Sequence, residues 1–373
     1  MEPRRILLVR LDGLGDFLLS LGAFAHIRAS FPEASLELLV DPGNAELAAR
    51  TGFFDFVHPF SYFPDHPGKS PKGAHEFQSM IEPLGLGDFD IVVDMRHYGS
   101  TRRLVAAIPA RFRFGFRARK KDADYDVLLP GFNRLPIGQR LHMTSRNMML
   151  ASTITQTFNR KPVQSFHSED WLNAQWSGSG GRTVRKILIN PFSGRAIKNW
   201  PVENYGALIE ALQERFETEV SFFGRTSDTD DQCRTELATL AGVTDLGTQL
   251  PIGDLIDRLT QTDLYIGNDS GTTHLAAMLG TPTLALMSGD VEAEVWRPVG
   301  KRVKILKGDV GCAPCFLNAL ENCPVDHRCM TAIGTETVLE EAGMLLEEHQ
   351  ASMPNLVPED GIPYHAARRE VSA

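Results

Sequence analysis

Residues 5–16 read RILLVRLDGLGD and contain, in order, a short apolar run, a turn with two glycines and the start of a helix. The run Arg5–Arg10 is short and rich in Leu, Ile and Val, which is typical of a buried strand in a parallel sheet. Gly13 and Gly15 allow the backbone to turn tightly after it. Residues 17–30 then continue as a predicted helix. This strand–turn–helix unit predicts a doubly wound α/β fold.

The same unit recurs along the chain. In the first half we expect strands at 36–40, 90–94 and 111–117 and a helix at 141–157. In the second half we expect strands at 186–190, 219–223, 263–267 and 283–286, and helices at 202–216, 229–240 and 272–279. A stretch rich in Ser, Gly and Pro separates the halves and has the composition of a linker. We therefore expect a domain at 1–160, a linker at 161–185, a second domain at 186–350 and a tail at 351–373.

Composition narrows the classes of function. The 373 residues carry 38 Lys and Arg against 47 Asp and Glu, a net charge of −9. This acidic balance argues against a nucleic-acid binder. No window of 18 uninterrupted apolar residues is present, and the first residues lack the apolar core of a signal peptide. We expect a cytoplasmic protein.

The charge is unevenly distributed. Residues 96–121 contain nine basic residues and no acidic one, so the remaining residues carry about −18 between them. A local basic surface on an acidic protein suggests one anionic partner bound at one place. Although most charge runs are only solvated faces, we take Arg102, Arg103 and Arg117 as candidate residues for binding an anionic acceptor.

Two loops that follow predicted strands could supply chemistry. Asp16, after the first strand, is either a helix cap or a general base at the edge of a cleft, and Gly15 beside it lets the backbone approach a ligand. After the strand at 186–190, Ser193, the Gly194 backbone and Lys198 form a plausible cradle for a diphosphate, with a hydroxyl, an amide and a cation.

The strongest motif is YIGNDSGTTHLAA at residues 265–277, where a strand ends and a helix begins. The free N–H groups at such a helix start favour an anion. The candidate donor-binding residues here are Asp269, Ser270, Gly271, Thr272, Thr273 and His274. A carboxylate beside an anion site needs a sugar hydroxyl or a basic group as partner, and His274 either faces the site or packs against the first helical turn.

Four of the five cysteines, Cys312, Cys315, Cys323 and Cys329, fall within eighteen residues. Four thiolates in one loop can form a tetrahedral site for structural zinc or iron. The alternative is a set of reduced thiols that only pack together. In either case the role is structural, because four thiolate ligands leave no open coordination position.

Taken together, these motifs resemble glycosyltransferase family 9, the bacterial ADP-heptose:lipopolysaccharide heptosyltransferases. The resemblance runs from about residue 5 to residue 338. It rests on R-x-x-x-x-G-D at 10–16, I-R-x-x-x-P at 27–32, N-P…K-x-W-P at 190–201, G-N-D-S-G-x-x-H-L-A-A at 267–277, G-T-P-T at 280–283 and C-x-P-C…C…C-M at 312–330.

The resemblance implies a GT-B fold, with two Rossmann-like domains facing a cleft, an acceptor domain first and a nucleotide-sugar domain second. It implies inverting transfer of a heptose from ADP-heptose, with no cofactor required for catalysis. Asp16 matches the family's catalytic base, although Asp12 competes for that role. Ser193, Gly194 and Lys198 match its diphosphate loop, and residues 269–272 match the loop that holds the donor sugar and phosphates.

The expected acceptor is an anionic glycolipid such as the lipopolysaccharide inner core, met at the inner face of the cytoplasmic membrane. Two alternatives stay open at this point. The same fold could glycosylate a protein or another glycan, or it could be a non-catalytic scaffold that binds a nucleotide or a metal. A dehydrogenase is disfavoured because neither half contains G-x-G-x-x-G, and a hydrolase because Ser270 lacks a G-x-S-x-G elbow.

Overall fold

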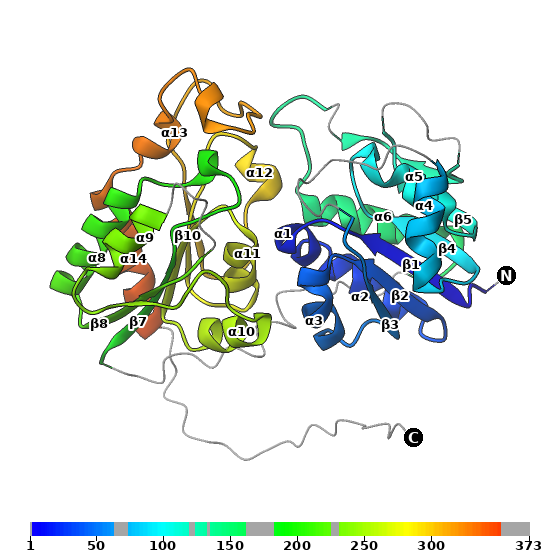
Figure 1. Ribbon diagram of the computed structural model, residues 1–373, viewed down its shortest axis with the longest axis horizontal. Coiled ribbons are helices and arrows are strands. Elements are labelled where there is room, and N and C mark those ends of the chain that lie inside the picture. Colours follow the sequence, from blue (N-terminus) through cyan, green and yellow to red (C-terminus); the bar gives the residue numbers. More distant parts are fainter. Residues whose placement is uncertain are drawn as a thin grey trace, which may run out of the picture.

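The computed structural model describes residues 2–62, 74–118, 124–132, 135–161, 183–224 and 231–351, and it contains two α/β domains that lie side by side (Figure 1). The linker expected at 161–185 and the tail expected at 351–373 fall almost wholly outside these ranges. The boundaries between the four predicted segments therefore stay predictions.

Each domain is built on a six-stranded parallel sheet, with strand orders β3-β2-β1-β4-β5-β6 and β12-β11-β10-β7-β8-β9. The first sheet comprises β1 Arg5–Arg10, β2 Ser35–Val40, β3 Phe56–Pro59, β4 Phe89–Asp94, β5 Ala110–Phe116 and β6 Val127–Leu129. The second comprises β7 Arg185–Asn190, β8 Thr218–Phe222, β9 Val243–Asp245, β10 Leu264–Asn268, β11 Thr283–Leu286 and β12 Val303–Leu306. Both sheets have the doubly wound order, so the predicted fold class is confirmed.

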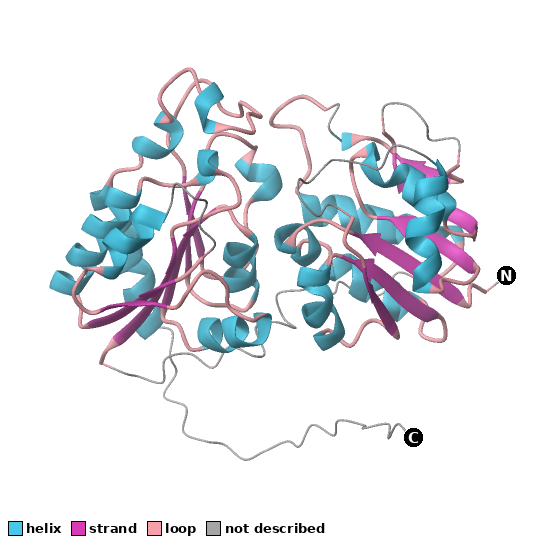
Figure 2. Cartoon of the chain, viewed as in Figure 1, coloured by secondary structure: helices cyan, strands magenta, loops and turns pink. Residues whose placement is uncertain are grey.

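Helices cover both faces of each sheet (Figure 2). Those of the first domain are α1 Leu14–Leu18, α2 Leu21–Ser30, α3 Pro42–Arg50, α4 Ala74–Ile81, α5 Arg102–Ala107 and α6 Met143–Thr157. Those of the second are α8 Val202–Arg215, α9 Asp231–Ala238, α10 Ile252–Thr260, α11 Gly271–Met278, α12 Ala293–Trp296, α13 Arg328–Thr331 and α14 Thr335–Ala351. Within the described residues, no helix combines the length and the hydropathy needed to span a bilayer.

The single helix predicted at 17–30 is wrong, because the structure breaks it into two. Residues 17–30 belong to two helices, α1 and α2, separated at Ser20. The carbonyl of Asp16 accepts hydrogen bonds from the Ser20 hydroxyl at 2.8 Å and from the guanidinium of Arg10 at 3.0 Å, while the Ser20 N–H donates to Phe17 instead. Such side-chain bonds compete with the helical ladder. The break leaves α1 as a single turn that carries Asp16.

The two domains meet through α1 and α11, which lie side by side (Figure 1). Buried apolar side chains of both domains, among them Phe17 and Leu275, belong to one continuous cluster. The backbones approach closely because glycine stands on both sides. A Cβ at Gly271 would lie 2.7 Å from Cβ of Leu14 and 3.0 Å from the Gly15 nitrogen. A side chain at residue 271 is therefore incompatible with this packing.

A second contact between the domains runs through the segment before α6. Arg140 forms an ion pair with Glu292 at 2.9 Å, and Glu292 also accepts from the Gly138 N–H at 3.0 Å. The His142 ring nitrogen Nε2 lies 2.9 Å from the Arg297 carbonyl. The cleft between the domains is thus bridged on one side by polar contacts and at α1 and α11 by close backbone packing.

We predict that Gly271→Ala opens the interface between α1 and α11. Overpacking of this kind typically costs about 1–3 kcal/mol, so the closed arrangement should lose population and the radius of gyration measured by small-angle scattering should rise. Gly13→Ala is the matched control, because a Cβ at Gly13 meets nothing within 4 Å. Identical scattering from Gly271→Ala and wild type would contradict this packing.

Candidate active site

The candidate residues lie where doubly wound sheets bind ligands. In each sheet the strand order reverses between two central strands, β1 and β4 in the first sheet and β7 and β10 in the second. Ligands bind in the crevice outside the carboxyl ends of such strands. The loops that follow β1, β7 and β10 carry the three sequence motifs. All three motifs therefore lie at a reversal point.

On the first domain, Arg10 organises two carboxylates. Its guanidinium is 1% exposed and pairs with Asp16 at 2.9 Å and with Asp12 at 3.2 Å. Arg96, after β4, forms a second ion pair with Asp12. The Asp12 side chain is 12% exposed and the Asp16 side chain is 30% exposed. Asp12 is thus held between two cations, whereas Asp16 has one and is the more open of the two acids.

Asp16 has an unusual acidity. Burial in the cleft raises the pKa of this carboxyl to about 6, and the nearby charge of Asp12 also raises it. Arg10, Arg96 and His274 oppose the rise but do not cancel it. A carboxylate whose pKa lies near neutrality can accept a proton from a ligand and release it afterwards. The geometry therefore suits Asp16 for proton transfer.

On the second domain, Lys198 forms an ion pair with the buried carboxylate of Asp269. Burial alone would raise the pKa of Asp269, but Lys198 and His274 hold it well below its usual range. The Nε2 atom of His274 lies 3.7 Å from Asp269, and a Cβ at Gly15 would lie 3.2 Å from the His274 ring. His274 therefore packs between the two domains, next to Asp269 and beside the turn that carries Asp16.

Two asparagines that the sequence analysis missed support these loops. Asn268, at the end of β10, accepts from the Trp200 N–H at 3.0 Å and donates to the Pro191 carbonyl at 2.7 Å. Asn190, at the end of β7, donates to the Thr272 hydroxyl at 2.8 Å. Both asparagines lie in the motifs quoted above, at the ends of predicted strands. These positions were the sequence signal that could have identified them. They tie the loop after β7 to the loop after β10.

A cavity of about 460 Å³ adjoins these loops, and residues of both domains line it. Of the predicted donor-binding residues, Ser193, Gly194, Ser270 and Thr272 line this cavity. The first domain contributes Leu14 and the start of α3. The structure thus brings the predicted donor loops together around one space that is open to a ligand.

Thr273 and Ser193 are placed differently from the expectation. Thr273 is fully buried, and its hydroxyl donates to the Asn268 carbonyl at 2.5 Å, so this side chain faces the domain interior. The Ser193 hydroxyl donates to the Arg195 carbonyl at 2.8 Å, so it is used for a hydrogen bond within the loop itself. Ser270 and Thr272 both line the cavity, so the prediction that their hydroxyls contact a donor stays a prediction that this geometry allows.

The positive charge of the basic segment, residues 96–121, is partly neutralised by acidic residues outside it. Arg102 is buried, pairs with Asp94 and donates to the Phe116 carbonyl. Its charge is therefore used inside the domain, which removes Arg102 from the set available to an acceptor. Arg103 and Arg117 are exposed, and they stand in α5 and directly after β5, at the carboxyl edge of the first sheet.

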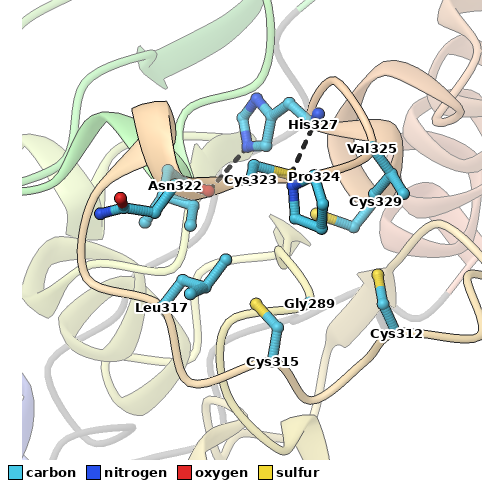
Figure 3. A pocket seen from close by; sticks show the side chains of 11 residues that line it. Gly289, Cys312, Cys315, Leu317, Asn322, Cys323, Pro324, Val325, His327 and Cys329 are labelled. Atoms are coloured by element: carbon cyan, nitrogen blue, oxygen red, sulfur yellow. Dashed lines mark hydrogen bonds between the residues drawn. The ribbon is translucent and has the colours of Figure 1, made fainter.

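The four cysteines of the loop after β12 line one pocket of about 250 Å³ (Figure 3), and all are free thiols. Burial raises the pKa of Cys329, and the other three thiols raise it further because they lie nearby. Among the residues that the structure describes, no three His, Cys, Asp or Glu side chains are arranged to hold a metal ion. As positioned, the thiols do not form the expected tetrahedral site.

Comparison with known proteins relates this chain to a family of glycosyltransferases. The model of glycosyltransferase family 9 (heptosyltransferase) matches residues 77–324. Lipopolysaccharide heptosyltransferase 3 of Escherichia coli K12 is 24% identical over 302 residues, which cover 76% of this chain and 82% of that protein.

Solved structures share the fold. Escherichia coli heptosyltransferase WaaC with ADP superposes with a TM-score of 0.68 at 16% identity, over 92% of this chain and 99% of that one. The iron-containing dodecameric glycosyltransferase TibC of enterotoxigenic Escherichia coli superposes with a TM-score of 0.55 at 14% identity, over 93% and 77% of the two chains. The predicted GT-B arrangement of two Rossmann-like domains is confirmed.

We predict that Lys198→Met destabilises the protein in a pH-dependent way. Removing one partner of a buried ion pair typically costs about 3 kcal/mol or more. Because the pKa of Asp269 is depressed in the folded protein, the contribution of the pair is complete above the unfolded-state pKa of about 4 and is lost only at lower pH. The gap between wild type and variant should therefore be largest near pH 7 and narrow in acid.

Thermal unfolding between pH 3 and pH 8 measures this gap. The control is Lys307→Met, which breaks an ion pair with Glu294 whose partners are 56% and 67% exposed, and exposed pairs contribute little. A gap that is independent of pH, or equal in the two variants, would show that the ion pair at Lys198 is not the cause.

Proposed function

The chain belongs to glycosyltransferase family 9, the heptosyltransferase family, and from that premise we propose that it moves a heptose from ADP-heptose to a hydroxyl of an anionic acceptor. The enzyme is a glycosyltransferase, so a purely non-catalytic scaffold is set aside. We further propose the lipopolysaccharide inner core as the acceptor class, in line with the name of the Escherichia coli relative, and inversion at the transferred carbon.

One observation carries this proposal. Asp16 on the first domain and the Lys198–Asp269 pair on the second lie on the two sides of the domain interface, with His274 beside both acids. A base from one side and a cation from the other are what a displacement at a sugar carbon between them requires. The acceptor hydroxyl attacks from the side of the base, and the diphosphate leaves on the side of the cation, which gives inversion.

We assign the donor to the cavity of about 460 Å³ between the domains. The loop at Ser193 and Gly194 and the first turn of α11 border it, so backbone amides are available to the phosphates. Gly271 stands at this helix start in close contact with Gly15 of the first domain. The neighbour crystallised with ADP supports a nucleotide of this kind. Lys198 would stabilise the charge that develops on the departing diphosphate.

We assign the role of general base to Asp16 rather than Asp12. The carboxylate of Asp16 takes the proton of the acceptor hydroxyl as the new glycosidic bond forms and the bond to the diphosphate breaks. Asp12 is held by Arg10 and Arg96, and we propose that its charge instead tunes the acidity of Asp16. Arg103 and Arg117 are the exposed cations that remain candidates for the acceptor's anionic groups.

We also propose, separately from the reaction, that the cysteine pocket takes up a structural zinc or iron ion. Soft thiolate donors suit both metals, and one structural neighbour is iron-containing. The side chains would have to draw together, because their present positions do not form a metal site. No catalytic step depends on such an ion.

We predict that Asp16→Asn lowers kcat by about 10²- to 10⁴-fold, the usual contribution of a general base. Wild-type kcat/KM should fall below about pH 6, where Asp16 becomes protonated. In Asp12→Asn that fall should move to lower pH, because Asp12 raises the pKa of Asp16. The assay measures product formation from ADP-heptose, with a lipopolysaccharide core, a protein and an unrelated glycan offered as acceptors.

The same assay can refute the assignment. If Asp12→Asn abolishes turnover and Asp16→Asn retains it, Asp12 is the base. If ADP-heptose is consumed only with the protein or the unrelated glycan, the donor assignment stands and the acceptor class is wrong.

Metal analysis tests the cysteine pocket. We predict about one zinc or iron per chain in protein purified without chelator, and loss of that metal in Cys315→Ser. Cys233→Ser is the control, since Cys233 lies outside the pocket. A metal-free wild type with four thiols that react with a thiol reagent would overturn this proposal.

A further inference from the structure

The cysteine loop, residues 308–330, packs against the donor-binding loop, by which we mean the loop after β7 that carries Ser193, Gly194 and Lys198. The pocket that the four cysteines line is also lined by Ile197 of the donor-binding loop and by Gly289 after β11 (Figure 3). The N–H of Cys315 donates to the Gly289 carbonyl at 2.9 Å, and a Cβ at Gly289 would lie 3.2 Å from Cβ of Cys329. The cysteine loop is therefore in close contact with the loop after β11, and it shares the pocket with Ile197 of the donor-binding loop.

His327 makes the most direct connection. Its ring nitrogen Nε2 donates to the Ile197 carbonyl at 2.7 Å, and the bond is buried. The backbone of His327 is left-handed, with φ 56°, and its N–H donates to the Cys323 sulfur at 3.3 Å (Figure 3). The ring is thus held by the cysteine loop and directed at the residue that precedes Lys198.

Arg195 makes a second connection, at the other end of the same short segment. Its guanidinium donates to the Asn318 side chain at 3.2 Å and pairs with the buried Asp290 at 2.5 Å. Asp290 in turn accepts from the Phe316 N–H through its carbonyl at 3.0 Å. Residues 195–198 are therefore bonded at both ends, either to the cysteine loop or to the loop after β11 that contains Asp290.

These attachments add to an independent anchor. Asn268 holds the Trp200 N–H and the Pro191 carbonyl, so the domain core fixes the segment on either side without the cysteine loop. The Ala196–Lys198 turn between those anchors is what the cysteine loop contacts. That turn carries the amine which pairs with Asp269.

From this arrangement we propose that the cysteine loop is the positioning element for the donor diphosphate site, and that His327 is its positioning residue, acting on Lys198 through the Ile197 carbonyl. The inference rests on the proposed function, because it assumes that Lys198 meets the donor diphosphate. It assigns His327 to donor binding alone. Acceptor binding, which belongs to the other domain, should not depend on it.

The test compares His327→Ala, His327→Gln and wild type. Loss of one buried hydrogen bond that orients a charged group should raise the Kd for ADP and the KM for ADP-heptose by about tenfold in His327→Ala. The acceptor KM should be unchanged. His327→Gln retains an N–H donor and should recover most of the affinity. Glu321→Gln, an exposed position on the same loop, is the control and should match wild type.

Two results would overturn the inference. One is an unchanged ADP Kd and donor KM in His327→Ala. The other is an equal loss in the alanine and glutamine variants with a matching rise in acceptor KM, which would mark general damage to the fold. Lys198→Met belongs in the same ADP titration. If it loses affinity while His327→Ala does not, only this inference fails. If wild type does not bind ADP, the proposed function fails and the inference with it.

Discussion

The close packing of α1 against α11 is the constraint on which the rest of the site depends. Gly15 and Gly271 let two backbones from different domains approach until a single added carbon would overlap. That approach places Asp16 within electrostatic reach of His274 and brings residues of both domains to the wall of the cavity of about 460 Å³. Without it, each domain would hold half of a charged cluster exposed to solvent, and the acidity of Asp16 would return toward that of an ordinary carboxyl.

Two carboxylates in this cleft have opposite properties because their surroundings differ. Asp269 is buried against an amine, and Lys198 keeps its pKa low. Asp16 is only partly buried and shares the guanidinium of Arg10 with Asp12, and its pKa rises to about 6. Divergent acidities in one site are the usual mark of a division of labour between charge stabilisation and proton transfer. Asn268 and His327 bond the backbone on either side of Lys198, at Trp200 and at Ile197.

Much of the fold was predictable from local patterns. Strands such as Arg5–Arg10 and Thr283–Leu286 are short apolar runs, and every predicted strand has a counterpart in the sheets. The break in the helix predicted at 17–30 was not predictable. The side chains of Arg10 and Ser20 both donate to the Asp16 carbonyl, and the Arg10 bond exists only in the folded chain. The burial of Arg102 was also hidden, because it depends on Asp94 at the end of a neighbouring strand.

By itself, the sequence determined that two doubly wound domains would place three polar loops at the carboxyl ends of their central strands, because apolar periodicity and glycine turns are local properties. It also determined which residue types those loops offer. Only the tertiary structure decided how the charges pair. Asp12 pairs with Arg96 from the loop after β4, and Lys198 pairs with Asp269 from the loop after β10. The acidity of a carboxyl and its availability to a ligand depend on such distant partners. The proposal of Asp16 rather than Asp12 as the base rests on the same partners.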